Sequence, residues 1–230
     1  MEILKNIEIC ELALFVKDKR ILVIGDLHLG FEESLNKQGV MIPRFLFDDI
    51  VSILKKAISK TNPKKIVIVG DIKHEFGSIS DQEWRHALRL IDFLREKAEL
   101  TIIKGNHDIV LEPITKKRNV KVRTFYKEGS ILFAHGDFVV NEKTDVIIIG
   151  HEHPAVSFKE RPSQKYKCFL KGKYNKADLI VMPSFNTLVP GSDITKRDFL
   201  SPYLEKAKDI EVYIIEDKVY RFGKLNKLIF

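Results

Sequence analysis

Residues that commonly bind metal ions follow a run of branched apolar residues in the second half of the chain. Residues 145–149 read Asp-Val-Ile-Ile-Ile, a run typical of a buried strand, and Gly150-His151-Glu152-His153 comes directly after it. If the backbone stays extended, two histidines one residue apart point to the same side, where a pair of metal ions could share them. By themselves, two such histidines are more often ordinary residues of a surface loop.

Four other strand-like runs end in the same way, with a metal-binding type of residue beside a glycine. They cover residues 21–24, 65–69, 100–103 and 131–134. In a largely parallel sheet the carboxyl ends of the strands meet at one edge, where ligand sites form. Five of the seven histidines lie at these strand ends, which chance would rarely produce. The candidate site residues are therefore Asp26, His28, Asp71, Asn106, His107, His135, His151 and His153.

These residues offer only nitrogen and oxygen donors. Such a set suits Mn²⁺, Fe, Zn²⁺ or Ni²⁺ better than a metal that prefers thiolates. Even without His107 the candidates exceed one coordination sphere, so we expect two ions. Two-metal sites hold their ions ~3.5–4 Å apart and stabilise an in-line displacement at phosphorus.

Charge balance indicates what such a site would bind. Asp26 and Asp71 are the only carboxylates among the eight candidates, and Asp71 could bridge both ions. Two divalent ions would then keep an excess of positive charge. The site should attract an anion, and a water molecule between the ions should lose a proton near neutral pH.

The elements that must position these residues alternate between strand and helix in the first half of the chain. Residues 7–16 and 20–25 predict two strands joined as a β-hairpin. Apolar residues at helical spacing predict one helix within residues 43–60 and another from residue 80 to about 97. This alternation is typical of parallel βαβ units.

The second half of the chain is mainly strand-like. Ser80 and Glu83 predict a capping box at the start of the preceding helix. Together the two halves predict an α/β fold in which two mixed β-sheets pack on each other and helices flank them. We see no linker that would divide the chain, and we expect one domain over residues 1–230.

Composition narrows the class of partner only weakly. The net charge is +7 and the pI about 9.2, which suits nucleic acid or phosphate esters but is equally typical of a soluble surface rich in Lys and Glu. Lys116-Lys117-Arg118 favours a solvated loop, with contact to a phosphate backbone as the alternative.

Cysteine content and hydropathy indicate the compartment. Cys10 and Cys168 are far apart and predict no disulfide framework. No signal peptide and no apolar run approaching ~20 residues is visible, so we expect a cytoplasmic protein without a membrane partner.

Five motifs in order resemble those of the calcineurin-like metallophosphoesterase superfamily. They are Asp26-x-His28, Gly70-Asp71, Gly105-Asn106-His107-Asp108, His135 and Gly150-His151-x-His153. The resemblance implies a four-layer αββα sandwich. It also implies that one ion is held by Asp26, His28, Asp71 and His153, and the other by Asp71, Asn106, His135 and His151. His107 would stabilise or protonate the leaving oxygen, with Asp108 orienting it.

Within that superfamily the chain is similar to archaeal proteins related to the SbcD repair nuclease and to bacterial PdeM-like enzymes. The features are its length, residues 70–76 and Pro183-Ser184-Phe185-Asn186 followed by Gly191. Many members have an acidic residue three positions after the bridging aspartate, where this chain has His74. His74 could support a ligand, contact the substrate or be an ordinary loop residue.

These observations lead to three readings of function. The first is a phosphodiesterase or nuclease that acts on DNA through a metal-activated hydroxide, with manganese as the expected metal. The second is a phosphoesterase acting on small nucleotides or phosphomonoesters. The third, an inactive binding scaffold, is disfavoured because all seven ligand positions carry competent residues. The sequence leaves the oligomeric state open.

Overall fold

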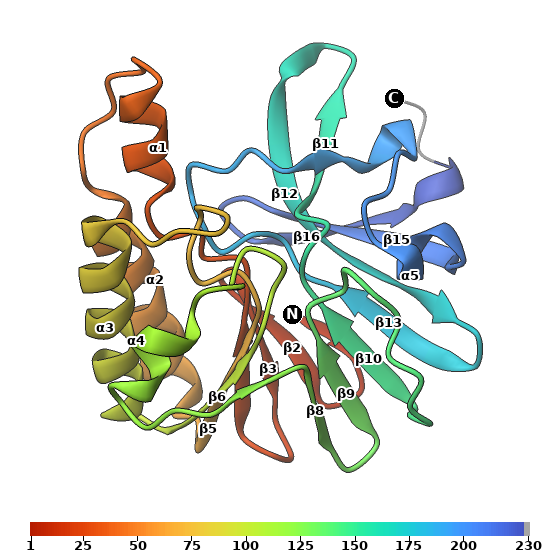
Figure 1. Ribbon diagram of the computed structural model, residues 1–230. Coiled ribbons are helices and arrows are strands. Elements are labelled where there is room, and N and C mark those ends of the chain that lie inside the picture. The colour runs from red at the N-terminus through yellow and green to blue at the C-terminus, as the bar shows by residue number, and fades with distance from the viewer. Residues whose placement is uncertain (228–230) are drawn as a thin grey trace.

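The computed structural model describes residues 1–227, which form two β-sheets packed face to face (Figure 1). The first sheet has parallel neighbours β4, β5 and β6 at its centre and an antiparallel meander at one side. Within the described residues its seven strands follow chain order: β1 (Glu2–Leu4), β2 (Ile7–Cys10), β3 (Ala13–Val16), β4 (Ile21–Ile24), β5 (Lys65–Val69), β6 (Glu99–Ile103) and β7 (Val122–Arg123).

The second sheet is also mixed. Its strands β9, β10 and β13 are parallel neighbours, while β12 is antiparallel to β11, β13 and β15. Its strands within residues 1–227 are β8 (Phe125–Glu128), β9 (Ile131–Ala134), β10 (Val146–Ile149), β11 (Pro154–Phe158), β12 (Arg161–Tyr174), β13 (Ala177–Val181), β14 (Ser192–Asp193), β15 (Lys208–Ile215) and β16 (Val219–Lys224).

Helices cover the outer faces of the two sheets unequally. The longer ones lie on the first sheet (Figure 1), and short helical turns lie with the second. None of the helices in residues 1–227 has the length and apolar character of a membrane span. The helices are α1 (Phe31–Lys37), α2 (Leu46–Thr61), α3 (Asp81–Arg95), α4 (Glu112–Lys116), η1 (Ile194–Lys196), α5 (Pro202–Glu205) and η2 (Leu225–Lys227).

The space between the sheets is filled by apolar side chains from both. Val67 and Ile103 of the first sheet belong to one buried cluster with Phe133, Ile148 and Phe169 of the second. The central strands are covered on both faces, which explains why their sequences are apolar throughout rather than alternating. The two sheets are therefore fixed relative to each other by a common core.

The predicted fold class is confirmed: two mixed sheets pack together with helices outside. The hairpin into β4 is also confirmed. The prediction of one strand over residues 7–16 is wrong, because the chain turns at Glu11, whose φ of 56° ends β2 and begins β3. The prediction of one domain over residues 1–230 stays a prediction, and its last three residues lie outside the described part.

The predicted capping box is present, and Glu83 also forms hydrogen bonds outside it. The Ser80 hydroxyl accepts the Glu83 N–H at 3.2 Å, and Glu83 accepts the Ser80 N–H at 2.7 Å. The other oxygen of this buried carboxylate accepts the N–H groups of His74 and Glu75, at 2.9 and 2.7 Å. One side chain therefore caps α3 and holds the loop after β5.

These contacts predict unequal effects of two substitutions at the cap. Ser80→Ala should lower the free energy of unfolding by about 0.5–2 kcal/mol, the usual cost of losing a cap. Glu83→Ala should cost more, because three backbone N–H groups lose their acceptor. Urea unfolding would measure both, with Arg85→Ala on the exposed side of α3 as the control. A cost for Glu83→Ala no larger than for Ser80→Ala would contradict this account.

Candidate metal centre

The eight candidate residues lie together, at the edge where strands from both sheets end. Strands β4, β5 and β6 of the first sheet and β9 and β10 of the second lead into the loops that carry them. Apart from His107, their donor atoms fall into two groups that share Asp71. The residues are Asp26, His28, Asp71, Asn106, His107, His135, His151 and His153.

The first group combines Asp26, His28, Asp71 and His153, whose donor atoms all lie within 4.8 Å of one another. The Nε2 atoms of His28 and His153 are 3.1 Å apart. His28 Nε2 lies 3.7 Å from Asp71 Oδ2, and His153 Nε2 lies 3.6 Å from Asp26 Oδ2. Two imidazole nitrogens and two carboxylates thus converge on one point.

The second group is centred on His135. Its Nε2 atom lies 2.8 Å from Asn106 Oδ1, 3.1 Å from His151 Nδ1 and 3.4 Å from Asp71 Oδ2. His135 Nδ1 donates to the carbonyl of Val69 at 3.1 Å, which leaves Nε2 free to act as a ligand. Because Asp71 Oδ2 also faces the first group, this single oxygen lies between the two.

Five of these residues have a left-handed backbone. The φ angles are 54° at Asp26, 43° at His28, 47° at Asp71, 66° at His151 and 49° at His153. This region is rare for residues other than glycine, and such strain gathers at functional sites. The backbone at His151 and His153 is therefore not extended, so the condition for both side chains to point to the same side is not met, and they join different groups.

The glycines of the motifs make room for ligands from neighbouring strands. A Cβ atom on Gly70 would lie 2.1 Å from His135 Nδ1, and one on Gly105 would lie 2.1 Å from Asp71 Oδ1. A Cβ atom on Gly150 would lie 2.4 Å from Asp26 Oδ2. Each glycine lets its own loop approach a ligand that another strand carries.

The donors fit divalent cations. They are imidazole, carboxylate and amide groups, and within residues 1–227 the buried Oδ1 atom of Asp26 has no hydrogen-bond partner. Buried polar atoms without a partner are uncommon and call for an unseen one. Asp71 Oδ1 accepts the His107 N–H at 3.0 Å, which leaves Oδ2 for the shared position.

The electrostatics of the centre also favour a cation. Burial and the neighbouring His153 hold the pKa of His28 well below its ordinary value, which disfavours the protonated ring. Burial would raise the pKa of Asp71, but the hydrogen bond and charge of His135 bring it below its usual range. Against its own burial, His135 has its pKa raised to about 10 by Asp71. The carboxylate of Asp71 thus stabilises positive charge at the position of His135.

A clamp of side chains holds the backbone of residues 26–28 from behind. Ser184 Oγ donates to the carbonyl of Asp26 at 2.7 Å. Asn186 Nδ2 donates to the next two carbonyl oxygens, at 3.0 and 3.2 Å. Lys167 Nζ in turn donates to the carbonyls of Ser184 and Asn186, at 2.8 and 2.7 Å, and burial lowers the pKa of this lysine to about 7.

Sequence reasoning missed this clamp. The stretch Pro183-Ser184-Phe185-Asn186 stands out in the sequence, but nothing in it shows which backbone its side chains reach. Glu152, between two candidate ligands, was missed in the same way. Its buried carboxylate accepts the N–H groups of Leu200 and Ser201, at 2.9 and 3.0 Å, and so fixes the loop after β10 that carries His151 and His153.

Asp108 lies elsewhere than its expected role requires. Its buried carboxylate accepts the N–H groups of Ile72, Lys73 and Gly105, at 3.1, 3.3 and 3.1 Å. Within residues 1–227 no hydrogen bond joins it to the His107 ring. Burial and the charge of Asp71 raise the pKa of Asp108 to about 7. Asp108 therefore joins two ligand loops instead of orienting His107.

His74 orients the His107 ring through its backbone. His107 Nδ1 donates to the carbonyl of His74, so Nε2 is the nitrogen left to face a ligand. The His74 ring itself lies within reach of the centre: one nitrogen each of His28, His74 and His107 lie within 4.8 Å of one another. His74 is thus a neighbour of the site and not a remote loop residue.

The basic run 116–118 has partners within the chain. Lys116 forms an ion pair with Glu112 at 2.9 Å, and Arg118 binds Asp92 Oδ2 at 2.8 Å. The Lys117 amine lies 4.7 Å from the centroid of the tryptophan ring. These contacts favour a structural role over contact with a phosphate backbone.

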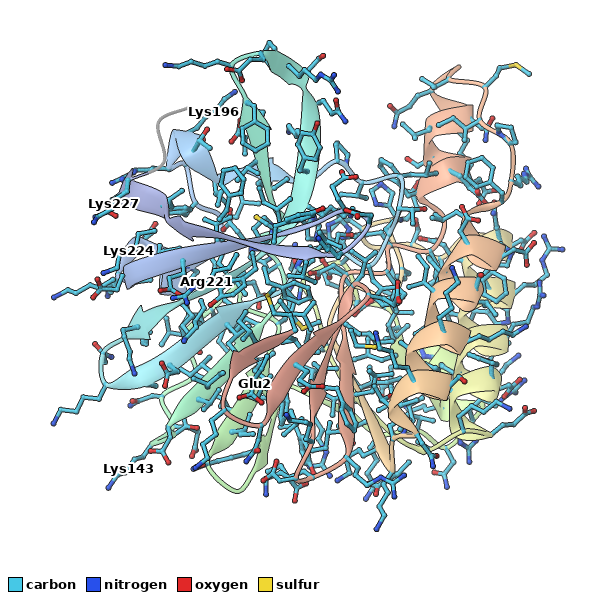
Figure 2. All side chains as sticks on the ribbon, turned by 180° about the vertical axis from the view of Figure 1, so that it is seen from behind. Glu2, Lys143, Lys196, Arg221, Lys224 and Lys227 are labelled. Carbon is cyan, nitrogen blue, oxygen red and sulfur yellow. The ribbon has the colours of Figure 1, made fainter. Side chains whose placement is uncertain are left out.

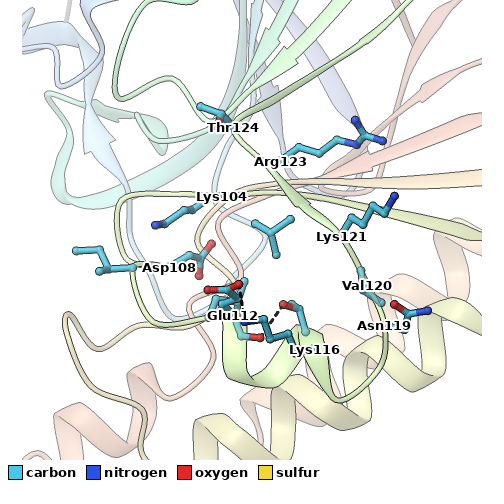
Figure 3. Close-up of a pocket in the computed structure, with 13 residues that line it drawn as sticks. Lys104, Asp108, Glu112, Lys116, Asn119, Val120, Lys121, Arg123 and Thr124 are labelled. Atoms are coloured by element: carbon cyan, nitrogen blue, oxygen red, sulfur yellow. Dashed lines mark hydrogen bonds and ion pairs between the residues drawn. The ribbon is translucent and has the colours of Figure 1, made fainter.

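A cavity of about 570 Å³ adjoins the centre without containing its ligands. The buried side chain of Asp108 lines it, together with Lys104 and Glu112. Lys121 and Arg123 point away from Lys104 (Figure 3), so their charges do not converge on one point. The cavity is therefore separate from the two donor groups.

Comparison with known proteins was informative for the family and the fold. No curated protein matches the chain in sequence. Among solved structures, nuclease MPE from Pseudomonas putida has a TM-score of 0.67 at 16% identity, with 91% of each chain covered. At that identity the likeness shows the fold alone. A protein of unknown function from Aquifex aeolicus has a TM-score of 0.37 at 20% identity, covering 62% of this chain and 82% of its own.

The family match covers the part of the chain that holds most of the centre. The calcineurin-like phosphoesterase family matches residues 19–138, from the hairpin into β4 to just beyond β9. This range includes Asp26, His28, Asp71, Asn106 and His135 and exceeds half of the 230 residues. On this match and on the fold, the chain belongs to the calcineurin-like phosphoesterase family.

Proposed function

We propose that this protein is a phosphodiesterase that uses two divalent ions, with manganese as the expected metal and DNA as the expected substrate. The observation that carries the proposal is the position of Asp71 Oδ2, 3.7 Å from His28 Nε2 and 3.4 Å from His135 Nε2. One carboxylate oxygen facing two sets of donors suits a bridge between two ions. When bound, such ions supply a nucleophile at neutral pH and stabilise the charge of the phosphoryl group.

The two donor groups suggest which residues hold each ion. We assign the first ion to Asp26, His28, Asp71 and His153. We assign the second ion to Asp71, Asn106, His135 and His151. Each set offers four donors of the nitrogen and oxygen types that Mn²⁺, Fe, Zn²⁺ or Ni²⁺ accept.

The chain's own contribution to bond cleavage comes from His107. Its Nδ1–H group donates to the carbonyl of His74, so in the imidazolium form the second proton is on Nε2. Nε2 can then donate its proton to the leaving oxygen of the ester. General acid catalysis of this kind contributes typically 10²–10⁴-fold to the rate.

Net charge and fold similarity support nucleic acid as the substrate. The net charge is +7, and the similar fold from Pseudomonas putida carries the name nuclease. The resemblance to SbcD-related and PdeM-like proteins points the same way. Lys143 and Lys196, however, project from the face seen in Figure 2, and Arg221 there pairs with Glu211 at 2.7 Å. Because the charge is spread over the surface, it does not by itself select DNA.

A panel of phosphate esters would test the proposed activity. With Mn²⁺ the protein should hydrolyse bis-p-nitrophenyl phosphate and single-stranded DNA, and a chelator should abolish both activities. Double-stranded DNA, RNA, cyclic nucleotides and p-nitrophenyl phosphate complete the panel. Hydrolysis of the phosphomonoester alone would contradict the phosphodiesterase assignment.

Metal binding should respond differently to substitutions at the bridge and at the clamp. Asp71→Asn should lower the binding affinity for both ions, because Asp71 belongs to both sets of donors. Asn186→Ala should weaken the binding of the first ion about 10–100-fold, because Asn186 holds the backbone at His28. The affinity for the second ion should stay unchanged. Titration with Mn²⁺ would resolve the two steps, with Asn141→Ala on the exposed surface as the control. Equal weakening of both ions by Asn186→Ala would count against the clamp.

The role of His107 can be separated from metal binding. His107→Ala should retain both ions and lose rate, by about 10²–10⁴-fold for a DNA phosphodiester. The loss should be small for bis-p-nitrophenyl phosphate, since nitrophenolate leaves without a proton. If His107→Ala releases an ion, or slows both substrates equally, His107 is a ligand or a phosphate-binding residue instead.

A further inference from the structure

An exposed phenyl ring lies against the histidine that we assign to the leaving group. Phe76 is 56% exposed, and its ring centroid is 3.7 Å from that of His107, with the ring planes tilted by 37°. Several other aromatic residues are exposed. In the described part of the chain, Phe76 is the only one of them with a ring contact to a candidate site residue.

The backbone that carries Phe76 is held on its N-terminal side. The N–H group of Glu75 donates to the buried carboxylate of Glu83 at 2.7 Å. The carbonyl of Glu75 accepts from the amine of Lys73, whose side chain is fully buried. On the other side, Gly77 has a φ of 66° and no atom within 4 Å of the position its Cβ would take. The segment is therefore fixed just before Phe76, and the part of the ring that does not contact His107 is exposed to solvent.

We propose that Phe76 is a stacking platform for the nucleobase of the leaving nucleoside. This proposal rests on the proposed function, in which His107 reaches the leaving oxygen. In a nucleic acid that oxygen belongs to a sugar, and the same sugar carries a base. Because the Phe76 ring touches His107, it lies near the sugar that carries the leaving oxygen. The base attached to that sugar can therefore stack on the ring.

Stacking of this kind defines a class of substrate. Every base has a π-face, so a phenyl platform accepts all of them with little sequence preference. In a duplex the bases are stacked inside the helix, and only unpaired bases are free to meet a protein ring. The preferred substrate is therefore a single strand or an unpaired end, not an intact duplex.

Three dinucleotides would test the platform in the manganese-loaded protein. They are the thymidine dinucleotide and two analogues in which one or the other thymine is missing, and the products identify the leaving side. Loss of the thymine on the leaving side should lower kcat/KM about fivefold or more, as expected for one stacked base. Loss of the other thymine should have a smaller effect.

Variants at Phe76 should report on that base alone. Phe76→Ala should lower kcat/KM for the full dinucleotide by about the same factor and leave the analogue without the leaving-side thymine unchanged. Phe76→Trp should keep the preference, and Phe125→Ala, at an exposed ring in β8, should change nothing. If Phe76→Ala slows all three substrates equally, or keeps the preference intact, the proposal is overturned. Phe76 would then only support His107.

A binding measurement separates this proposal from the proposed function. If no diester is hydrolysed, the proposed function fails, but stacking can still be observed. The emission of Phe76→Trp, measured above the background of the native Trp84, should be quenched by thymidine 5′-monophosphate and not by deoxyribose 5-phosphate. An equal response to the two ligands would overturn the platform.

Discussion

The buried carboxylate of Asp71 is the group on which the rest of the centre depends. One oxygen accepts the N–H group of His107, and the other lies between the two sets of donors. A buried charge is costly unless partners surround it, and no single strand can supply them. Loops from both sheets must therefore meet at Asp71. This approach requires glycine at position 105, because a Cβ atom there would collide with the Asp71 carboxylate. The common core between the sheets makes that meeting possible.

The strained ligand backbone is stabilised by buried acceptors and donors on the side away from the ligands. Asp108 binds the loop after Asp71, and the pair Ser184 and Asn186 binds residues 26–28. Glu152 binds the N–H groups of the two residues that precede α5. Such groups fix the ligands before any ion arrives and reduce the cost of ordering them. The candidate centre thus consists of candidate ligands and, on the other side of their backbone, buried side chains that bind that backbone.

The parts of this arrangement that local patterns encode could be predicted from the sequence. Apolar runs located the strands, and motifs beside glycines located the candidate ligands that the structure brings together. The clamps could not be predicted, because Asn186 acts on a carbonyl 159 positions earlier in the chain. The backbone conformation at His151 was left open, because histidine is found in both extended and left-handed backbone. The start of β12 has no apolar pattern that would predict a strand, since its first residues, Arg161 to Lys165, are exposed.

The central claim is that strand ends from both sheets form two ion sites joined by Asp71. Anomalous diffraction from crystals soaked in Mn²⁺ would test it most directly. The account predicts two peaks, with Asp71 in contact with both. One peak should lie among Asp26, His28 and His153, and the other among Asn106, His135 and His151. A single peak, or two peaks that do not share Asp71, would contradict it.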